Sequence, residues 1–439
     1  MRAWALPACA GLALAAGLAT AFAGSSPAFS RKDYRTGQGP YDVVSADVNA
    51  DGRPDLVTAD LYGNSVSVLI NRGHGAFAPA ADYATGKGPS DVVVGDVNGD
   101  GRPDLITADT SEAGSLITVL RNLGAGRFGA TSFPAAAGAT DVELADLDGD
   151  GKPELVVANE NAGSFSVFPN LGSTFGARTD YPAPPGPGSI ALADLNGDGA
   201  LDVVVSEFDA DSVAVFPNQG DGTFGPSAQY ETGTGPSWVA VADLNGDGKL
   251  DLATANYSVD SVSVLLNRGD GTFAPSVDYE TGMGPVEADV ADVDHDGKPD
   301  LLTPNNAGET ASVLWNAGGG SFDRRTDYLV GNPNQGLAPT SIAARDLNGD
   351  GKLDLAVAKA STSSVSVLLN TTGLCSVPSL RGKTLADAKH ALRRSGCRLG
   401  KVTRARSSRV RAGRVISQTP GPGAVRPHAT RVDLVVSRG

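Results

Sequence analysis

The chain has 439 residues, of which 41% are hydrophobic, 56 are Gly and 27 are Pro, and its formal net charge is −15. This much Gly and Pro excludes a mainly helical protein and indicates many short strands joined by turns. The charge is divided unevenly, because the segment from Leu374 to the C-terminus holds 15 Lys and Arg against two acids, which is +13 and leaves −28 for the rest. We therefore expect two domains of opposite charge, joined by a linker at residues 371–374.

The first 23 residues have the pattern of a secretory signal peptide. Arg2 precedes an apolar run from Trp4 to Phe22, and small residues flank Phe22 as they do at a cleavage site. An N-terminal membrane anchor is the alternative, although no stop-transfer charges follow the run. No later segment reaches the roughly 20 apolar residues of a membrane helix. We expect a secreted protein with no membrane span in its mature chain.

An acidic loop then recurs seven times. Loops of the form DxNxDG or DxDxDG begin at positions 47, 96, 146, 194, 243, 292 and 346, and DLNGDGKLDLA occurs identically at 243–253 and 346–356. In each unit one alternating run enters the loop (239–242), a second leaves it (252–255), a third follows (261–267), and a fourth extends from Phe273 to about Tyr279. Period-two alternation predicts half-buried antiparallel strands. Four strands in about 49 residues, seven times over, predict a mainly β fold, a seven-bladed β-propeller.

The two ends of the array support a closed ring. The seventh unit stops at Asn370 without its fourth strand, and the missing piece, FSRKDY, stands at Phe29–Tyr34 ahead of the first unit. An N-terminal strand that completes the last blade would leave no sheet edge exposed. The propeller is therefore predicted over residues 29–370. One Phe recurs in each of six units, and we expect these rings in the core: Phe77, Phe128, Phe175, Phe224, Phe273 and Phe322.

The acidic loop has the spacing of a calcium site. Carboxylate or amide oxygens stand at loop positions one, three, five and nine, a Gly stands at position six, and the carbonyl of position seven is a further candidate ligand. An EF-hand is excluded because position twelve is never Glu and lies in a strand. Ordinary turn formation is the alternative, but seven copies of closely spaced acids favour a bound cation.

The predicted ligands occupy the same five positions in every loop, giving up to seven Ca²⁺ sites. They are Asp47, Asn49, Asp51, Arg53, Asp55; Asp96, Asn98, Asp100, Arg102, Asp104; Asp146, Asp148, Asp150, Lys152, Glu154; Asp194, Asn196, Asp198, Ala200, Asp202; Asp243, Asn245, Asp247, Lys249, Asp251; Asp292, Asp294, Asp296, Lys298, Asp300; and Asp346, Asn348, Asp350, Lys352, Asp354. The loops at Asp146 and Asp292 have four acids, and we expect them to bind most tightly.

These units resemble the FG-GAP or VCBS repeats of bacterial secreted proteins and of integrin α chains. The resemblance rests on DLNGDGKLDLA, on Phe-Gly pairs such as Phe128-Gly129, and on Gly-Pro steps such as Gly235-Pro236. It implies a calcium-stabilised propeller of the kind used for adhesion or ligand recognition. The same fold also carries lectins and some lyases, so the resemblance implies no single activity.

The basic tail, residues 375–439, resembles a PASTA domain in VPSLRGKTLADAKHALRRSGCRLGKV and the segment after it. A helix is expected with Thr384 as N-cap, Asp387 in its first turn and Gly396 as its stop. The resemblance implies contact with peptidoglycan, and the charge favours an anionic wall polymer. Nucleic acid is not expected, because no aromatic stacking platform accompanies the basic residues.

Two cysteines, Cys375 and Cys397, remain once the signal peptide is removed. An even pair in an oxidising compartment predicts one disulfide. In the PASTA-like segment this bond would join the first strand to the end of the helix. Without a CxxC motif, and with His390 as the one histidine nearby, a catalytic thiol is not expected.

A ligand site would lie on the face opposite the acidic loops, where the connections vary from unit to unit. The residues expected there are Asp60, Leu61, Tyr62, Ser111, Glu112, Glu207, Phe208, Asp209, Trp238, Tyr257 and the connection 331–338. GxSxG, HExxH and phosphate-loop motifs are absent, so no catalytic residues are assigned. The prediction is a secreted, wall-tethered, calcium-binding module that adheres to an extracellular protein or glycan. The alternative is a secreted lyase or hydrolase acting on polysaccharide.

Overall fold

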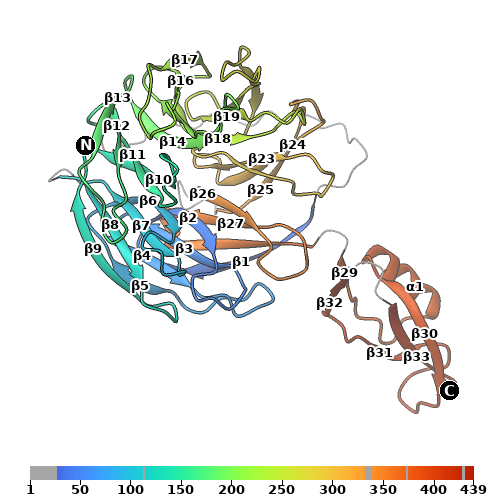
Figure 1. The fold of residues 1–439 in the computed structure, drawn as a ribbon. Helices are drawn as coiled ribbons and strands as arrows, with labels where there is room; N and C mark the ends of the chain where they lie inside the picture. Colours follow the sequence, from blue (N-terminus) through green and yellow to red (C-terminus); the bar gives the residue numbers. More distant parts are fainter. Residues whose placement is uncertain (1–26, 112–113, 332–338, 372–373, 428–430) are drawn as a thin grey trace, which may run out of the picture. The chain divides into compact units, whose positions relative to one another are not determined.

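The structure is a computed structural model that describes residues 27–111, 114–331, 339–371, 374–427 and 431–439. Side chains are not described at 374–376, 394 and 425–427. The signal-peptide prediction, Glu112 and most of the connection 331–338 therefore lie outside the described residues. The chain forms two compact units, one of Arg31–Leu369 and one of Asn370–Gly439 with Pro27–Ser30, and each is taken separately below (Figure 1).

The larger unit consists of seven four-stranded antiparallel sheets, which are the blades of a propeller. The first, inner strands are β2 (Pro40–Ala46), β6 (Pro89–Gly95), β10 (Ala139–Ala145), β14 (Pro187–Ala193), β18 (Pro236–Ala242), β22 (Asp289–Ala291) and β26 (Pro339–Arg345). The second strands are β3 (Asp55–Asp60), β7 (Asp104–Asp109), β11 (Glu154–Asn159), β15 (Asp202–Glu207), β19 (Asp251–Asn256), β23 (Asp300–Asn305) and β27 (Asp354–Lys359).

The third strands are β4 (Ser65–Leu69), β8 (Leu116–Asn122), β12 (Ser164–Phe168), β16 (Ser212–Phe216), β20 (Ser261–Leu265), β24 (Thr310–Trp315) and β28 (Ser364–Asn370). The outer strands are β5 (Ala81–Ala84), β9 (Phe128–Pro134), β13 (Thr179–Pro182), β17 (Ala228–Glu231), β21 (Val277–Glu280), β25 (Arg324–Leu329) and β1 (Phe29–Arg35). A short 3₁₀ helix, η1 (Ala360–Thr362), joins β27 to β28.

The ring closes through the N-terminal strand. Blade 7 has the strand order β1-β28-β27-β26, so β1 supplies its missing outer strand, as the sequence predicts. Each inner strand contacts the inner strands of both neighbouring blades, including β26 of blade 7 against β2 of blade 1. The seven-bladed propeller predicted from the repeat period is therefore confirmed.

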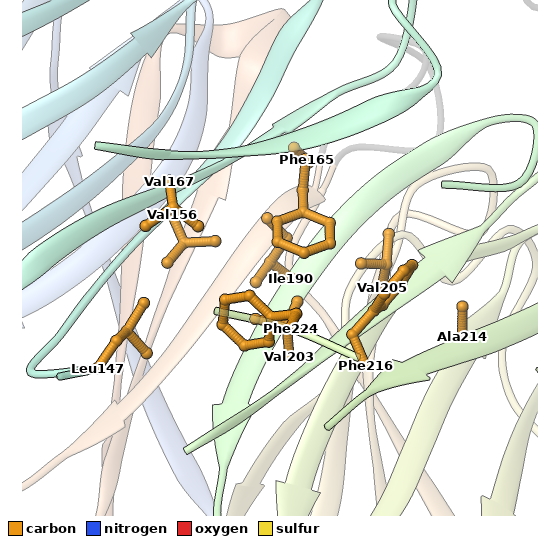
Figure 2. Packing of buried hydrophobic residues seen from close by; sticks show 11 residues of the cluster. Leu147, Val156, Phe165, Val167, Ile190, Val203, Val205, Ala214, Phe216 and Phe224 are labelled. Atoms are coloured by element: carbon orange, nitrogen blue, oxygen red, sulfur yellow. The ribbon is translucent and has the colours of Figure 1, made fainter. Parts of the chain in front are cut away.

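The expectation of half-buried strands is wrong for the middle of each blade. The second strands are buried at every position, and the third strands at nearly every position. The reason is that blades pack face to face, so both faces of these strands meet a neighbour. Figure 2 shows one such layer, where Phe165 of blade 3 packs edge-on against Phe216 and Phe224 of blade 4, with ring centroids 4.9 and 5.5 Å away.

In five blades the outer strand begins later than the sequence suggests, whereas β9 and β1 begin at Phe128 and Phe29 as expected. In blade 5 the strand starts at Val277, whereas Phe273 forms an isolated bridge with Asn267. The same Asn–Phe bridge occurs in blades 1, 3 and 4. Five of the six recurring Phe rings are buried, as predicted, and Phe175 is partly buried.

The smaller unit has one helix, α1 (Leu385–Arg394), and five strands: β29 (Leu374–Ser376), β30 (Arg398–Ala405), β31 (Val415–Thr419), β32 (Val425–Pro427) and β33 (Arg431–Ser437). Strand β33 lies between β30 and β31, and β29 pairs with β32. Thr384 caps the helix by accepting from the Asp387 N–H, and Gly396 follows it with φ +68°, so the predicted helix signals are confirmed.

Cys397 is buried in the core of this unit beside Leu392 and Val432. The side chain of Cys375 lies outside the described side chains, so the bond between the two cysteines stays a prediction. In the part of the chain that the structure describes, no helix is both long and apolar enough to cross a membrane.

Candidate metal centres and binding surfaces

Each acidic loop is the hairpin between the first and second strands of a blade, and its first carboxylate holds it closed. In the loop of blade 3, Asp146 accepts from the Gly151 N–H at 2.9 Å and from the Gly149 N–H at 2.9 Å. The bond from the position-six N–H recurs in all seven loops, at 2.7–2.9 Å. The first Asp therefore has a folding role that does not depend on an ion.

The carboxylate at loop position nine is buried and connects the acidic loop to the third strand of its blade through hydrogen bonds. Asp251 accepts from the Leu244 N–H in the loop at 3.0 Å and from the Asn267 N–H at the end of the third strand at 2.8 Å. Desolvation, with a smaller contribution from the charges of the neighbouring loop acids, raises the pKa of Asp55 to about 6 and that of Asp300 to about 7. A cation beside these carboxylates would offset the repulsion between them and the neighbouring loop acids.

The loops of blades 3 and 6 bring three carboxylates together. Asp146, Asp148 and Glu154 each offer an oxygen within 4.8 Å of the others, and so do Asp292, Asp294 and Asp300. Two oxygens that bind one Ca²⁺ at about 2.3–2.6 Å can be no more than about 5 Å apart. Both clusters therefore fit such an ion, and they are the two four-acid loops that the sequence singles out.

The loop of blade 1 gives a second test of fit. Asn49 stands at position three, and its buried Oδ1 has no hydrogen-bond partner in the described residues. A buried acceptor without a donor is costly, and a cation would satisfy it. The donor set of this loop, like those of blades 3 and 6, suits a hard cation.

The fifth-position carboxylate lies outside both clusters. It pairs with the side chain of position seven instead: Asp51 with Arg53 at 2.6 Å, Asp150 with Lys152 at 2.6 Å. Similar pairs occur in the loops at Asp96, Asp243 and Asp292. In blades 3 and 6 the structure thus brings positions one, three and nine together, and the position-five carboxylate would have to leave its ion pair to bind the same cation.

On the opposite face, two of the predicted ligand-site residues have structural roles instead. Asp60 and Glu207 are fully buried at the ends of β3 and β15. Asp60 accepts from Thr58, Ser65 and Ser67, and Glu207 accepts from Ser212 and Gln229. The sequence alone could not show that these two acids end a strand rather than belong to the following loop, because both kinds of acid stand at the same place in the repeat.

Several exposed side chains on this face are apolar or aromatic, beside exposed polar residues such as Asp209. Tyr62 is 68% exposed and Met283 57%. Phe208 and Tyr257 lie against the Gly-Pro turn of the next blade, where a Cβ on Gly235 or Gly284 would come within 3.1–3.2 Å of their rings. The side chains on this face therefore differ in chemical character from blade to blade.

A ring of buried acids and serines at the inner strands was missed by sequence reasoning. We call these residues the inner ring: each is the third residue of an inner strand or, in blade 6, Glu287, two residues before β22. In six of seven blades the residue accepts a hydrogen bond from a backbone N–H of the next inner strand. The bonds are Asp42 to Val92, Asp91 to Val142, Asp141 to Ile190, Ser189 to Val239, Glu287 to Ile342 and Ser341 to Val43. Aligning the units on this position would have found it.

Burial perturbs these acids strongly. Desolvation raises the pKa of Asp42 to about 6 and that of Asp91 well above its usual value. Besides desolvation, the neighbouring charges of Asp141 and Asp42 favour the protonated form of Asp91 and so raise its pKa. Two residues further along, desolvation raises the pKa of Glu143 to about 8 and that of Asp289 to about 6. The inner ring therefore joins the blades through partly protonated carboxyls.

Solved structures support the propeller fold. The crystal structure of BBS1N in complex with ARL6DN, soaked with lead, is 15% identical with a TM-score of 0.55, over 77% of this chain and 94% of that one. The same complex soaked with mercury is 14% identical with a TM-score of 0.54, over 79% and 96%. An Agrocybe aegerita lectin that recognises non-reducing terminal N-acetylglucosamine is 21% identical with a TM-score of 0.48, over 76% and 86%. At 14–15% identity the likeness to the two BBS1N structures concerns the fold alone.

Family models match both units. The model described as FG-GAP-like repeat matches residues 47–107, 96–157, 146–205, 194–254, 243–303 and 305–357. Each of the first five matches spans two successive acidic loops, and the sixth spans the loop of blade 7. The model described as PASTA domain matches residues 376–438. The repeat matches together span well over half of the chain. The chain therefore belongs to the FG-GAP-like repeat proteins and carries a C-terminal PASTA domain.

Proposed function

We propose that this protein is a secreted, calcium-loaded propeller that acts as an extracellular binding or adhesion module and is held at the cell wall by its PASTA domain. The propeller comprises residues 29–370 and the PASTA domain residues 375–439. Both families are non-catalytic. The observation that carries the proposal is the division of the propeller surface, with seven similar acidic hairpins on one face and a varied, partly aromatic surface on the other.

Calcium is the ion that best suits the hairpins. Seven Ca²⁺ would add +14 and offset about half of the propeller's charge of −29. Carboxylate and amide oxygens on a flexible loop match the irregular coordination of Ca²⁺ better than the strict octahedron of Mg²⁺. The proposed ligands are the residues at loop positions one, three, five and nine, with the position-seven carbonyl.

Wall retention is supported by the surface of the PASTA domain. Its described Lys and Arg side chains are exposed, among them Arg404, Arg409, Arg411 and Arg414. Helix α1 and the three-stranded sheet enclose an apolar core, so these charges stand on a folded surface rather than a loose tail. Such a surface attracts anionic wall polymers, and added salt would screen the attraction.

The test compares the mature full-length chain with a version lacking residues 374–439. Both are incubated with purified peptidoglycan and, separately, with an array of glycans and extracellular proteins in millimolar calcium. We expect the full chain alone to sediment with peptidoglycan and both versions to bind the same array ligands.

Two results would overturn the proposal. Equal sedimentation of the two versions would remove the wall-anchoring role. Release of oligosaccharide from a polysaccharide substrate would replace the binding module with the alternative, a secreted lyase or hydrolase.

A further inference from the structure

Neighbouring blades meet at their outer edges through a repeated aromatic contact. A Tyr of the outer strand packs edge-on against a Phe of the next blade, with ring centroids 5.2–5.5 Å apart: Tyr34 on Phe77, Tyr83 on Phe128, Tyr181 on Phe224, Tyr230 on Phe273 and Tyr279 on Phe322. At four of these seams the Tyr hydroxyl donates to a Gly carbonyl in the next blade's turn: Gly75, Gly126, Gly271 and Gly320.

The seam between blades 2 and 3 departs from this pattern at three positions. Phe133 replaces the Tyr, and the turn Asn170–Phe175 is one residue shorter than its counterparts and lacks the Gly that would accept the hydroxyl. Arg121 replaces a residue that is apolar in the other six blades: Ile70, Pro169, Pro217, Leu266, Trp315 and Leu369. In three other seams the apolar side chain packs on the Gly whose carbonyl accepts the Tyr hydroxyl. A Cβ on Gly75 would meet Leu369, one on Gly126 would meet Ile70, and one on Gly320 would meet Leu266.

The three changes compensate one another chemically. Losing the hydroxyl alone would leave the Gly carbonyl without its donor, and losing the Gly alone would leave a hydroxyl without its acceptor. Because both are missing, the seam between blades 2 and 3 has neither a Tyr hydroxyl without an acceptor nor a Gly carbonyl without its donor. The ring centroids of Phe133 and Phe175 lie 5.8 Å apart and the rings are tilted by only 37° rather than edge-on. Phe175 is partly buried, whereas the corresponding Phe of the other seams is buried.

A pocket of about 380 Å³ occupies this seam. Val97, Val119 and the two Phe rings form its apolar side, and Arg121 with the Ser and Thr side chains of the outer strand and the turn forms its polar side. Arg121 also donates to the Ser173 carbonyl across the seam, which uses one of the five N–H donors of a guanidinium. None of the described lining residues is acidic.

We propose that this seam pocket binds one carboxylated sugar residue of an extracellular glycan. The C–H face of a sugar ring stacks on the Phe rings, its hydroxyls meet Thr131, Ser132, Ser173 and Thr174, and its carboxylate pairs with Arg121. The proposal rests on the proposed function, of which it names the ligand class. Since the propeller carries −29 overall, the ligand has one carboxylate at the pocket rather than a densely charged chain.

The test titrates the mature full-length protein, in saturating calcium, with methyl glucuronide, methyl glucoside and benzoate by ligand-observed NMR. Arg121→Leu restores the residue found in blades 5 and 7, Arg121→Lys keeps the charge without the planar fork, and Arg268→Leu removes an exposed Arg from the equivalent turn of blade 5 as a control. We expect methyl glucuronide to bind at least tenfold more tightly than the other two probes. Arg121→Leu should lose that preference, Arg121→Lys should lose part of it, and Arg268→Leu should keep it.

Melting temperatures close to that of the unchanged protein would show that the variants fold. Equal binding of glucuronide by Arg121→Leu and the unchanged protein overturns the pocket assignment, and equal binding of benzoate and glucuronide overturns the sugar assignment. If the array and the wall assay are positive while glucuronide fails to bind, this inference falls and the proposed function stands. If those assays are negative as well, both fall.

Discussion

At the scale of single residues, the acidic loops show how closely backbone geometry constrains the sequence. Loop position four is left-handed in all seven loops, with φ between 59° and 80°. Five loops have Gly there, but blade 1 has Ala50 and blade 6 has His295. A non-Gly residue in this conformation costs roughly 1–2 kcal/mol.

Ala50→Gly and His295→Gly should therefore each raise the free energy of unfolding by about 0.5–1 kcal/mol, because the relief of strain exceeds the added entropy of the unfolded chain. Ala200→Gly, at loop position seven, is the matched control and should lower it by a similar amount. Chemical denaturation in saturating calcium measures all three. Destabilisation by all three substitutions would contradict the strain argument.

The inner ring predicts a pH dependence. The folded pKa values of Asp42, Asp91, Asp289 and Glu143 are raised above their unfolded values, so the folded state binds more protons. Their contribution to stability is present below about pH 4 and is lost as pH rises to about 8.

Asp91→Asn keeps an acceptor for the Val142 N–H and removes the ionisable group. We expect the free energy of unfolding of this variant to exceed that of the unchanged protein by about 1–3 kcal/mol at pH 8, and the difference to shrink as pH falls towards 4. The exposed Asp209→Asn serves as the control, and unfolding free energies across this pH range decide the matter. A constant difference between Asp91→Asn and the unchanged protein would show that this carboxyl does not titrate in the range.

At the scale of elements, strand β1 decides whether the ring is closed. In blade 7 Lys359 is buried at the end of β27, and its amine lies 3.2 Å from Asp33 of β1. Although burial opposes ionisation, hydrogen bonds from Arg31 and Ser366 and the charge of Lys359 lower the pKa of Asp33 to about 2. The other second strands end in an acid or an amide at this position, so the Lys–Asp pair is specific to the closing blade.

Asp33→Asn should lower the free energy of unfolding by about 2 kcal/mol, because it leaves the Lys359 charge buried; the figure allows for the partial exposure of Asp33. The control is Asp278→Asn in blade 5, whose carboxylate accepts from Ser263 at 2.6 Å as Asp33 does from Ser366, but beside the neutral Asn256. Thermal and urea unfolding of the pair measure the difference. Similar losses in both variants would mean that the ion pair contributes nothing to closure.

At the scale of the whole molecule, the sequence predicts the strands and loops that recur in every blade. It does not predict the features that depend on contacts with another strand or blade. The period of the acidic loops and the detached strand at Phe29–Tyr34 predict the blade number and the closure, because each blade needs the same four strands. Burial of both faces of the middle strands was not predictable, because it depends on blade-to-blade packing. The roles of Asp60 and Asp91 were missed for the same reason, since each depends on a partner from another strand or blade.

The last prediction concerns calcium and the stability of the whole propeller. An ion that binds the folded state alone stabilises it by about 2.7 kcal/mol per independent site at a hundredfold excess over Kd. Chelation should therefore lower the melting temperature sharply, and Mg²⁺ should restore little of the loss because it keeps its water and demands a smaller octahedron.

Single hairpins can be ranked within the same experiment. Asp148→Asn and Asp294→Asn convert the two four-acid loops to the composition of their neighbours, and each should reduce the calcium-dependent gain in melting temperature while leaving the value in chelator nearly unchanged. Asp180→Asn, an exposed outer-strand acid, is the control. The measurement is thermal unfolding in millimolar calcium, in chelator and in magnesium. Identical curves in the three conditions would mean that the hairpins are held by the first Asp and the buried ninth-position carboxylate alone, as ordinary turns that bind no ion.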